Sequence, residues 1–356
     1  MKKTIMWQYL EEIPEKAMQL IDSNQIKQFL AKFNTTDLSR ILFIGSGSSK
    51  NIALVSQSLF EKEAKIPTEV YTPTQFLDKN LELYEATSVL VIAISQTGTS
   101  SGTVQSIEYA KNHGLPVLSI TERPNTPVHL SGDHYLNFQC DLEDTNAKTK
   151  GYINSLILLK LLAIEMAQVR GTISNKNYDS FYQELKLSVR EIPDTIQKTI
   201  LWLENNKHWV QVNNLLAIGY GTNYGSAIEG SLKLLETLGV VGCACELGEF
   251  SHGYHRTLSA SSAIISIQTE EIGKSDAIIT NNYISNVTNK LLIINSSDYN
   301  YSSDRTINVS NRQYSLSAIN IAVVFQVMAA FLPEVIGYDP NRKLHDELTE
   351  VLKIRE

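Results

Sequence analysis

Carboxylates, an amine and an imidazole occur in the second half of the sequence at spacings that suit proton transfer. Glu229, Lys233 and Glu236 recur at i, i+4 and i+7, so their side chains share one face of a predicted helix. Glu249 and His252 follow a short distance along the chain. Moving a proton between neighbouring carbons requires a carboxylate that removes and returns it, and a second group that shuttles protons at oxygen. These residues could supply both, although a solvated salt-bridge face and a structural histidine are the simpler interpretation.

Two segments of the first half are rich in glycine and hydroxylated residues. Gly45–Ser49 and Ser95–Ser100 each follow a predicted strand and lead into a predicted helix. The positive end of a helix favours an anion there, and hydroxyl groups add neutral donors to phosphate oxygens. The candidate phosphate ligands are Ser48, Ser49, Ser95, Gln96, Thr97 and Ser100, with Gly47 and Gly98 as further candidates beside the substrate. Ordinary helix N-caps are the alternative explanation.

These two segments favour a sugar phosphate over a nucleotide. The sequence has no Gly-Lys-Ser/Thr of a P-loop, and no glycine fingerprint followed by a ribose-binding acid. A dehydrogenase with a dinucleotide cofactor is therefore a weak hypothesis, and we expect no cofactor and no metal. Cys243 and Cys245 have no second Cys or His pair nearby at the spacing of a zinc site.

The elements that must position these residues alternate between short apolar runs and longer helical patterns, as parallel βαβ units do. We predict strands at Ile41–Ile44, Val89–Ile94, Pro116–Ile120, Leu215–Ile218, Ala263–Ile267, Leu291–Ile294 and Thr306–Val309. Apolar helices are predicted at Tyr152–Met166 and Leu316–Ile336. The predicted fold class is α/β, with two domains that each have a flavodoxin-like or Rossmann-like parallel sheet flanked by helices. Ligands of such sheets bind at the carboxyl ends of the strands.

The length of 356 residues suits two domains of ordinary size. We expect the first domain, with an N-terminal helix and the phosphate segments, at residues 1–170. A helical connector is expected at residues 171–207, and the second domain, with the acid–base residues and a C-terminal tail, at residues 208–356. The second domain repeats the strand–glycine–helix arrangement of the first, which indicates a weak internal duplication.

Composition and charge exclude several classes of function. The net charge of -7 is unlike that of nucleic-acid binders, which present a basic face. Three cysteines in a chain of this size indicate a reducing compartment and not a disulfide framework. The N-terminus has no signal-peptide pattern and no run approaches a membrane span, so we expect a cytoplasmic protein.

The segment Ser95–Ser100, preceded by the turn at Gly45–Ser49, resembles the sugar isomerase (SIS) domain, and the likeness extends from Trp7 to about Asp339. The chain is most similar to the isomerase half of glucosamine-6-phosphate synthase, with its tandem SIS domains. The resemblance implies that Ser49, Ser95, Gln96, Thr97 and Ser100 bind the sugar phosphate, and that Glu143, Thr149 and Lys150 match the family's acidic residue and Thr-Lys pair. Lys148 stands where the synthases carry a serine.

The acid–base residues also resemble that family. Lys233 and Glu236 match its Lys-x-x-Glu, and the sixteen-residue step from Glu236 to His252 is the one that separates the family's catalytic pair. We predict that Glu236 is the general base at C1 and C2 and that His252 opens the sugar ring. The resemblance implies a homodimer or higher homo-oligomer with a shared active site, in which His252 is donated across the subunit interface. Lys233 is predicted to orient or polarise an oxygen, and Glu249 to hold His252 in its working tautomer.

Other features depart from the synthases. No glutaminase domain is expected, so the chain should not make ammonia from glutamine by itself. No tail lysine aligns with the ring-opening lysine of the family, and Lys343, His345 or Lys353 could substitute for it. The motif from Glu249 to Gly253 is closer to that of the fructosamine-6-phosphate deglycases, although Tyr254 replaces the usual proline.

Three functions therefore remain open. The first is a phosphosugar isomerase-type enzyme acting on a 6-phosphorylated amino sugar or ketose, with or without deamination. The second is a fructosamine-6-phosphate deglycase that releases an amine or amino acid. The third, of another class, is a non-catalytic regulator that binds a sugar phosphate, although no DNA-binding segment precedes the first domain.

Overall fold

The computed structural model describes residues 4–342, 344–345 and 347–355, which divide into two compact units. The β1–β5 unit comprises described residues within Glu15–Glu143, Lys150–Tyr182 and Lys343–Glu356. The β6–β10 unit comprises those within Met1–Pro14, Asp144–Thr149 and Gln183–Arg342. Two helices, α1 (Ile5–Ile21) and α8 (Asn175–Arg190), contain residues of both units.

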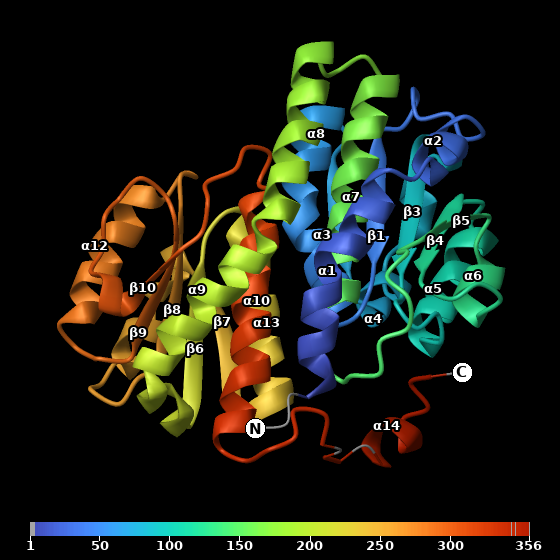
Figure 1. Cartoon of the computed structure of the whole chain (residues 1–356). Coiled ribbons are helices and arrows are strands. Elements are labelled where there is room, and N and C mark those ends of the chain that lie inside the picture. Colours follow the sequence, from blue (N-terminus) through green and yellow to red (C-terminus); the bar gives the residue numbers. More distant parts are fainter. Residues whose placement is uncertain (1–3, 343, 346, 356) are drawn as a thin grey trace. The chain divides into compact units, whose positions relative to one another are not determined.

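The β1–β5 unit is built on a parallel sheet with the strand order β2-β1-β3-β4-β5 (Figure 1). Its strands are β1 (Arg40–Ile44), β2 (Thr68–Tyr71), β3 (Val89–Ile94), β4 (Val117–Thr121) and β5 (His134–Asn137). Its other helices are α2 (Gln25–Leu30), α3 (Ser48–Leu59), α4 (Pro73–Leu77), α5 (Ser101–Asn112), α6 (Pro127–Ser131), α7 (Lys150–Val169) and α14 (Glu347–Val351).

The central strands of this sheet are covered on both faces, which explains their continuous apolar sequence. On one face, Leu42 and Val91 pack in a cluster with Phe76 of α4 and Val104 of α5. On the other face Phe43 meets Phe60, which directly follows α3, with ring centroids 5.3 Å apart. Helix α3 also packs against α7, whose residues are almost all buried.

The β6–β10 unit has its own parallel sheet, with the order β10-β9-β8-β6-β7. Its strands are β6 (Asn214–Gly219), β7 (Val241–Glu246), β8 (Ile264–Thr269), β9 (Leu291–Ser296) and β10 (Thr306–Asn308). Its other helices are α9 (Ile192–Asn205), α10 (Thr222–Leu238), α11 (Leu247–Phe250), α12 (Lys274–Ser285) and α13 (Ser317–Val335). Helix α13 packs against α9 and α10.

Both sheets have the same topology. Numbered from the first strand of each unit, both orders are 2-1-3-4-5, so β1 corresponds to β6 and β3 to β8. In both units the first strand is followed by a helix, α3 or α10, that packs on a long buried helix, α7 or α13. The predicted α/β class with two flavodoxin-like parallel sheets is therefore confirmed.

Strands β2, β5 and β7 were absent from the sequence-based prediction. All three pair with a neighbour on one side only, and none has the continuous burial of the central strands. In β7, Val241 and Cys243 are exposed, so its sequence lacks the uniform apolar run that marks a central strand. Edge strands of this kind give a weak periodic signal.

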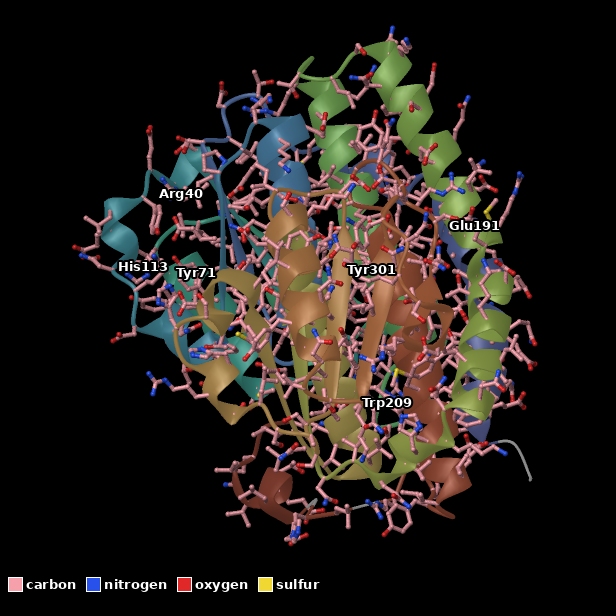
Figure 2. The ribbon with its side chains drawn as sticks, turned by 90° about the vertical axis from the view of Figure 1, so that its left-hand side faces the viewer. Arg40, Tyr71, His113, Glu191, Trp209 and Tyr301 are labelled. Atoms are coloured by element: carbon pink, nitrogen blue, oxygen red, sulfur yellow. The ribbon has the colours of Figure 1, made fainter. Side chains whose placement is uncertain are left out.

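A polar cluster joins the amino end of β1 to edge strand β2. The carboxylate of Glu69 on β2 forms an ion pair with Arg40 and accepts a hydrogen bond from the Tyr71 hydroxyl. Lys79 Nζ lies 3.2 Å from Glu69 Oε2. Arg40 and Tyr71, both in the β1–β5 unit, are labelled in Figure 2. Because each polar group has a partner, we regard the cluster as a structural tie across the sheet edge.

Two helices of the described chain are long and apolar enough to cross a membrane, namely α7 and α13. In each, the apolar window is mostly buried inside the structure, 89% and 83% respectively. Core helices of large α/β domains have the same length and composition, so these two helices give only weak evidence for a membrane span.

Candidate active site

The two glycine–hydroxyl segments lie at the same edge of one sheet. Strands β1 and β3 are parallel neighbours, with Ile44 opposite Ala93, so the residues that follow them leave the sheet side by side. Gly45–Gly47 then leads into α3, and Ser95–Ser100 into α5. The predicted convergence of the two segments at the carboxyl ends of their strands is therefore a feature of the structure.

The turn before α3 is built so that the chain can enter the helix abruptly. Gly47 caps α3 with φ 54° and ψ −129°, a conformation that residues with a side chain rarely adopt. A Cβ atom on Gly45 would lie 2.9 Å from the backbone of Ser49 and Lys50, which leaves no room for a side chain. Ser48 and Ser49 are therefore held in the first turn of α3, at the positive end of the helix dipole.

The Ser95–Ser100 segment is a compact turn whose hydroxyl groups lie close together. Ser95 is 5% exposed, and the Gly98 N–H donates to its carbonyl oxygen at 3.1 Å. Thr97 Oγ1 lies 3.0 Å from Thr99 Oγ1. Ser100 caps α5, because its Oγ accepts hydrogen bonds from the backbone and side chain of Thr103. The N-cap interpretation thus holds for Ser100, and a cap and an anion ligand are compatible roles at a helix N-terminus.

Glu143 is connected to this segment through its carboxylate. Its Oε2 accepts hydrogen bonds from Gln96 Nε2 at 3.3 Å and from the Gly151 N–H at 3.1 Å. Glu143 is 8% exposed, and Lys150, at the start of α7, is 2% exposed. The structure therefore brings the Glu143 carboxylate to the Gln96 amide, and their hydrogen bond fixes the orientation of that amide.

The C-terminal tail lies against the start of α5. Ser101 N–H donates to the Ile354 carbonyl oxygen at 3.2 Å, and Ser101 Oγ donates to the Lys353 carbonyl oxygen at 2.8 Å. Arg355 pairs with Ser100 as an antiparallel bridge. Of the three tail residues considered from the sequence, Lys353 is thus next to the Ser95–Ser100 segment. His345 is exposed, with Nδ1 3.5 Å from the Glu347 carboxylate, and Lys343 lies outside the described residues.

The predicted acid–base group lies on one face of α10. Lys233 is buried, and its Nζ lies 2.6 Å from Glu236 Oε2 and 3.4 Å from Glu229 Oε1. The Glu236 side chain is 28% exposed, whereas that of Glu229 is 4% exposed. The two carboxylates therefore share one buried ammonium group, and of the two Glu236 retains appreciable access to solvent.

This arrangement changes the proton affinity of both partners. Burial raises the pKa of Glu236, and Lys233 opposes that rise; Glu229 adds to it and Lys148 opposes it more weakly. Burial lowers the pKa of Lys233, but the two carboxylates outweigh burial and the net shift is upward. A raised pKa makes the Glu236 carboxylate a better proton acceptor than an ordinary glutamate, and the Lys233 ammonium stays charged beside it.

His252 and Glu249 lie on the exposed segment that includes α11 and the turn after it. The His252 N–H donates to the Glu249 carbonyl oxygen at 3.0 Å, and both side chains are exposed. Within the described residues, no hydrogen bond joins the His252 ring to the Glu249 carboxylate. The predicted tautomer-holding contact therefore stays a prediction.

The sequence analysis did not name Glu246 as a candidate residue, and it named Lys148 only as the replacement of a serine. Glu246 caps the short helix α11, because its Oε2 accepts from the Gly248 N–H at 2.6 Å, and it thereby positions the segment that carries His252. Lys148 belongs to the same unit as Glu236 and acts on its pKa. The sequence contained a signal for Glu246, an acidic residue at an N-cap, but none for the approach of Lys148.

Known proteins resemble this chain in sequence. Residues 36–165 match the SIS domain family. The isomerizing glutamine–fructose-6-phosphate aminotransferase of Caldanaerobacter subterraneus subsp. tengcongensis is 30% identical over 250 residues, which are 68% of this chain and 40% of that protein. The same enzyme of Methanosarcina mazei is 26% identical over 340 residues, covering 90% of this chain and 53% of the relative. The chain thus spans about half or less of the length of these relatives.

Solved structures share the fold over nearly the whole chain. A candidate phosphosugar isomerase from Clostridium difficile superposes with a TM-score of 0.88 at 23% identity, covering 98% of this chain and 97% of the other. The C-terminal domain of glucosamine-fructose-6-phosphate aminotransferase from Francisella tularensis gives 0.85 at 17% identity, covering 95% and 98%. Glucosamine-6-phosphate deaminase from Thermotoga maritima gives 0.77 at 18%, covering 96% and 98%. The predicted resemblance is confirmed: residues 36–165 of this chain match the SIS domain, and the solved structures share its two-sheet fold over nearly the whole chain.

Proposed function

We propose that this protein is an enzyme that interconverts the aldose and ketose forms of a 6-phosphorylated amino sugar or ketose, with or without release of the amine. The observation that carries the proposal is the Glu236–Lys233 pair, a partly exposed carboxylate of raised pKa held by a buried ammonium group. A regulator that only binds a sugar phosphate has no need of such a pair. The sequence relatives, which are aminotransferases of fructose 6-phosphate, support the substrate class.

In the proposed reaction Glu236 removes the proton from C2 of the aldose form, or from C1 of the ketose form, and leaves an enediol or enolamine. The same carboxylic acid then returns the proton to the neighbouring carbon, so no external acid or base is consumed. Lys233 stabilises the negative charge that develops on the adjacent oxygen. Before these steps His252 opens the sugar by taking the proton of the anomeric hydroxyl and delivering a proton to the ring oxygen, so that the ring C–O bond breaks as the carbonyl group forms.

The phosphate group of the substrate is assigned to the Ser48–Ser49 and Ser95–Ser100 segments. Two helix N-termini and several hydroxyl donors at one sheet edge favour a dianion. Gln96, held by Glu143, and Lys150 are assigned to the remainder of the substrate. In the C-terminal tail, Lys353 is the candidate for a role in ring opening, because its carbonyl oxygen accepts a hydrogen bond from Ser101 Oγ.

We further propose a cytoplasmic homodimer in which His252 reaches the Glu236 site of the other subunit. The exposed side of β7 supports this arrangement, because Val241 is 73% exposed and lines a groove of about 300 Å³ together with Cys243 and Tyr254. Interfaces between subunits commonly cover exposed apolar side chains of this kind.

A second candidate is a fructosamine-6-phosphate deglycase. The segment from Glu249 to Gly253 favours it, because phenylalanine follows the glutamate there as in the deglycases. The same general base would serve this reaction, since the amine departs from C1 only after a proton has moved between C1 and C2.

A substrate panel tests the proposal. The purified protein is incubated with hexose, hexosamine and fructosamine 6-phosphates, and products are followed by NMR together with ammonia and amino acid release. Conversion without release identifies an isomerase, ammonia release a deaminase, and amine or amino acid release a deglycase. If every sugar phosphate binds and none is converted, the enzyme proposal is wrong and the regulator is favoured.

The general base is tested with two matched variants. Glu236→Gln should lower kcat by about a hundredfold or more, because a general base contributes about 10²–10⁴ to the rate. Glu204→Gln, an exposed residue of the same unit, serves as the control and should keep full activity. Full turnover by Glu236→Gln would rule out the assignment.

A further inference from the structure

The β6–β10 unit contains a turn equivalent to the one that precedes α3. Gly221 caps α10 with φ 54° and ψ −134°, and Gly47 caps α3 with φ 54° and ψ −129°. The glycine two positions earlier is crowded in both turns, because a Cβ atom on Gly45 or Gly219 would collide with the helix backbone that follows. Each helix follows the first strand of its sheet, so the two turns occupy the same place in the two units.

The position in front of α10 is filled by a carboxylate of the chain itself. Glu271 Oε2 accepts a hydrogen bond from the Thr222 N–H at 3.0 Å, in the first turn of α10. The other oxygen, Oε1, accepts from Ser315 Oγ at 3.4 Å. A Cβ atom on Gly221 would collide with Glu271 Oε2, so the carboxylate fits closely against the bare backbone of the turn.

Glu271 comes from the loop that corresponds to Ser95–Ser100. That loop follows β8, the strand at the place of β3 in the sheet. Ile44 lies opposite Ala93 and Ile218 opposite Ser266, so the register places Gln268-Thr269-Glu270-Glu271, whose first two residues end β8, where the first unit has Ser95-Gln96-Thr97-Gly98. Carboxylates thus stand where the other unit has hydroxyl groups and glycine. A carboxylate oxygen satisfies a helix N-terminus in the way that a phosphate oxygen does.

The surroundings of Glu271 add negative charge. Glu270 and Asp298 both pair with Lys274, whose Nζ lies 2.8 Å from Glu270 Oε2, and Glu270 Oε1 also accepts from the Asp298 N–H at 2.8 Å. Two carboxylates for one ammonium group leave this strand end acidic. An external dianion would have to displace Glu271 and approach like charges.

We propose that Glu271 is an internal replacement for the phosphate group, which closes the second of two equivalent anion sites and restricts the sugar phosphate to the β1–β5 unit. The comparison with the first unit rests on the proposed phosphate role of Ser48–Ser49 and Ser95–Ser100. The geometry of Glu271 at α10 is independent of that role.

The proposal is tested by reopening the site. Glu271→Ser removes the carboxylate and the volume that it fills, and it places a hydroxyl group at the vacated position. Glu271→Gln is the matched control, because it removes the charge but keeps the volume and an acceptor for the Thr222 N–H. Inorganic phosphate is titrated into wild type and both variants at constant ionic strength, with thermal unfolding and hydrogen exchange as readouts.

Glu271→Ser should show a phosphate-dependent rise in melting temperature about 2–4 °C larger than that of wild type and Glu271→Gln, once phosphate exceeds the dissociation constant of the reopened site severalfold. Phosphate should also slow exchange of the backbone amides of residues 221–223 in this variant only. Equal phosphate dependence in all three proteins would overturn the proposal. If Glu271→Ser is unfolded in chloride buffer, phosphate must restore its folding, and failure to do so would overturn it as well.

The same titration separates this proposal from the proposed function. Ser95→Ala with Thr97→Ala should remove the phosphate response of wild type, and adding Glu271→Ser to that pair should bring back a response confined to residues 221–223. If wild type shows no phosphate binding, the proposed role of the first unit fails. The outcome for Glu271→Ser then still decides the role of Glu271.

Discussion

At the scale of single residues, the Glu236–Lys233 pair combines two opposing effects. Burial raises the pKa of Glu236, and the ammonium group 2.6 Å away limits that rise. The net effect is a pKa above the usual value of a glutamate, which makes the Glu236 carboxylate a better proton acceptor. Removing Lys233 would leave the buried Glu229 and the partly exposed Glu236 as neighbouring carboxylates without the ammonium group that they share.

The first prediction concerns the pH dependence that follows. The base acts when deprotonated, so kcat/KM should fall as the pH drops through the raised pKa of Glu236. Lys233→Met removes the charge that favours the carboxylate, so the acidic limb of the pH profile should move to higher pH. Lys148→Met should move it in the same direction by less, because its effect on Glu236 is the weaker one.

Profiles of kcat/KM between about pH 5 and 9 on the substrate identified by the panel check this expectation, with circular dichroism to confirm that each variant is folded. Lys207→Met, an exposed lysine of the same unit, is the control. A limb that stays in place in Lys233→Met would show that Glu236 is not the group that limits the rate at low pH.

The second prediction concerns the phosphate ligands. Replacing Ser95 and Thr97 together with Ala should raise KM at least about tenfold, because each hydrogen bond to a charged group contributes about 1.5–3 kcal/mol. The change in kcat should be smaller, since the phosphate is remote from C1 and C2. Thr87→Ala, an exposed threonine before β3, serves as the control; an unchanged KM in the double variant would contradict the phosphate assignment.

At the scale of elements, the loops at the strand ends depend on close approach of the backbone. Gly98 has a φ of 73°, and a Cβ atom on it would collide with the side chain of Thr126, which precedes α6. The loop thus packs directly on the neighbouring strand–helix connection. This contact fixes the position of Thr97 and Ser100 relative to the sheet.

The third prediction uses two glycines of similar conformation. Gly98→Ala should lower the free energy of unfolding by about 1–3 kcal/mol more than Gly171→Ala, because overpacking adds to the backbone strain. Gly171 has a φ of 67°, and a Cβ atom on it would meet no other atom within 4 Å, so only the strain remains there. Urea unfolding measures both, and KM should rise in Gly98→Ala alone. Equal destabilisation by the two substitutions would show that the loop can move away from Thr126.

The fourth prediction concerns the tail. Deleting the chain from Glu347 onward removes the backbone contacts that residues 353–355 make with Ser100 and Ser101. KM for the sugar phosphate should rise about three- to tenfold, as expected for the loss of one or two hydrogen bonds near a ligand. The melting temperature should change by less than about 2 °C, because α14 has no buried residue. Glu350→Gln, which leaves the backbone intact, is the control, and an unchanged KM in the deletion would exclude a role for the tail in binding.

At the scale of the whole molecule, one topology is used twice for different chemistry. The β1–β5 unit presents hydroxyl groups at the ends of its first and third strands. The β6–β10 unit presents Glu271 at the corresponding place and carries the Lys233–Glu236 ion pair farther along α10. A duplicated fold can diverge in this way because the sheet fixes where loops emerge but not their side chains.

The fifth prediction tests whether two chains complete one site. Glu236→Gln and His252→Ala are each expected to be nearly inactive, but a heterodimer would contain one intact Glu236–His252 combination if His252 is donated by the partner. Mixing and refolding the two variants should restore up to about a quarter of wild-type activity, from random pairing of two subunit types. Mixing Glu236→Gln with Lys233→Met is the control and should restore none, because both residues lie on the same helix. No recovery in the first mixture would place His252 in the site of its own chain.

Much of the fold followed from local sequence. Residues of β1, β3 and β9 are apolar throughout most of their length because both faces of a parallel sheet are covered, so these strands were recognisable from a few neighbouring residues. The Lys233–Glu236 contact was predictable for a similar reason, since three helical positions bring two side chains to one face. The edge strands β2, β5 and β7 were not predicted, because their mixed exposure gives them no continuous apolar run.

The sequence by itself therefore determined the central strands, the glycine–hydroxyl segments that follow two of them, and the face of α10 that Glu229, Lys233 and Glu236 share. The tertiary structure alone decided that the tail bonds to Ser101, over a separation of 252 residues, and that Glu271 reaches Thr222, 49 residues away. The physical reason is the separation along the chain over which each kind of interaction acts. Periodicity and capping act within one or two turns of chain, whereas these contacts arise only after the sheets have brought distant loops to one edge.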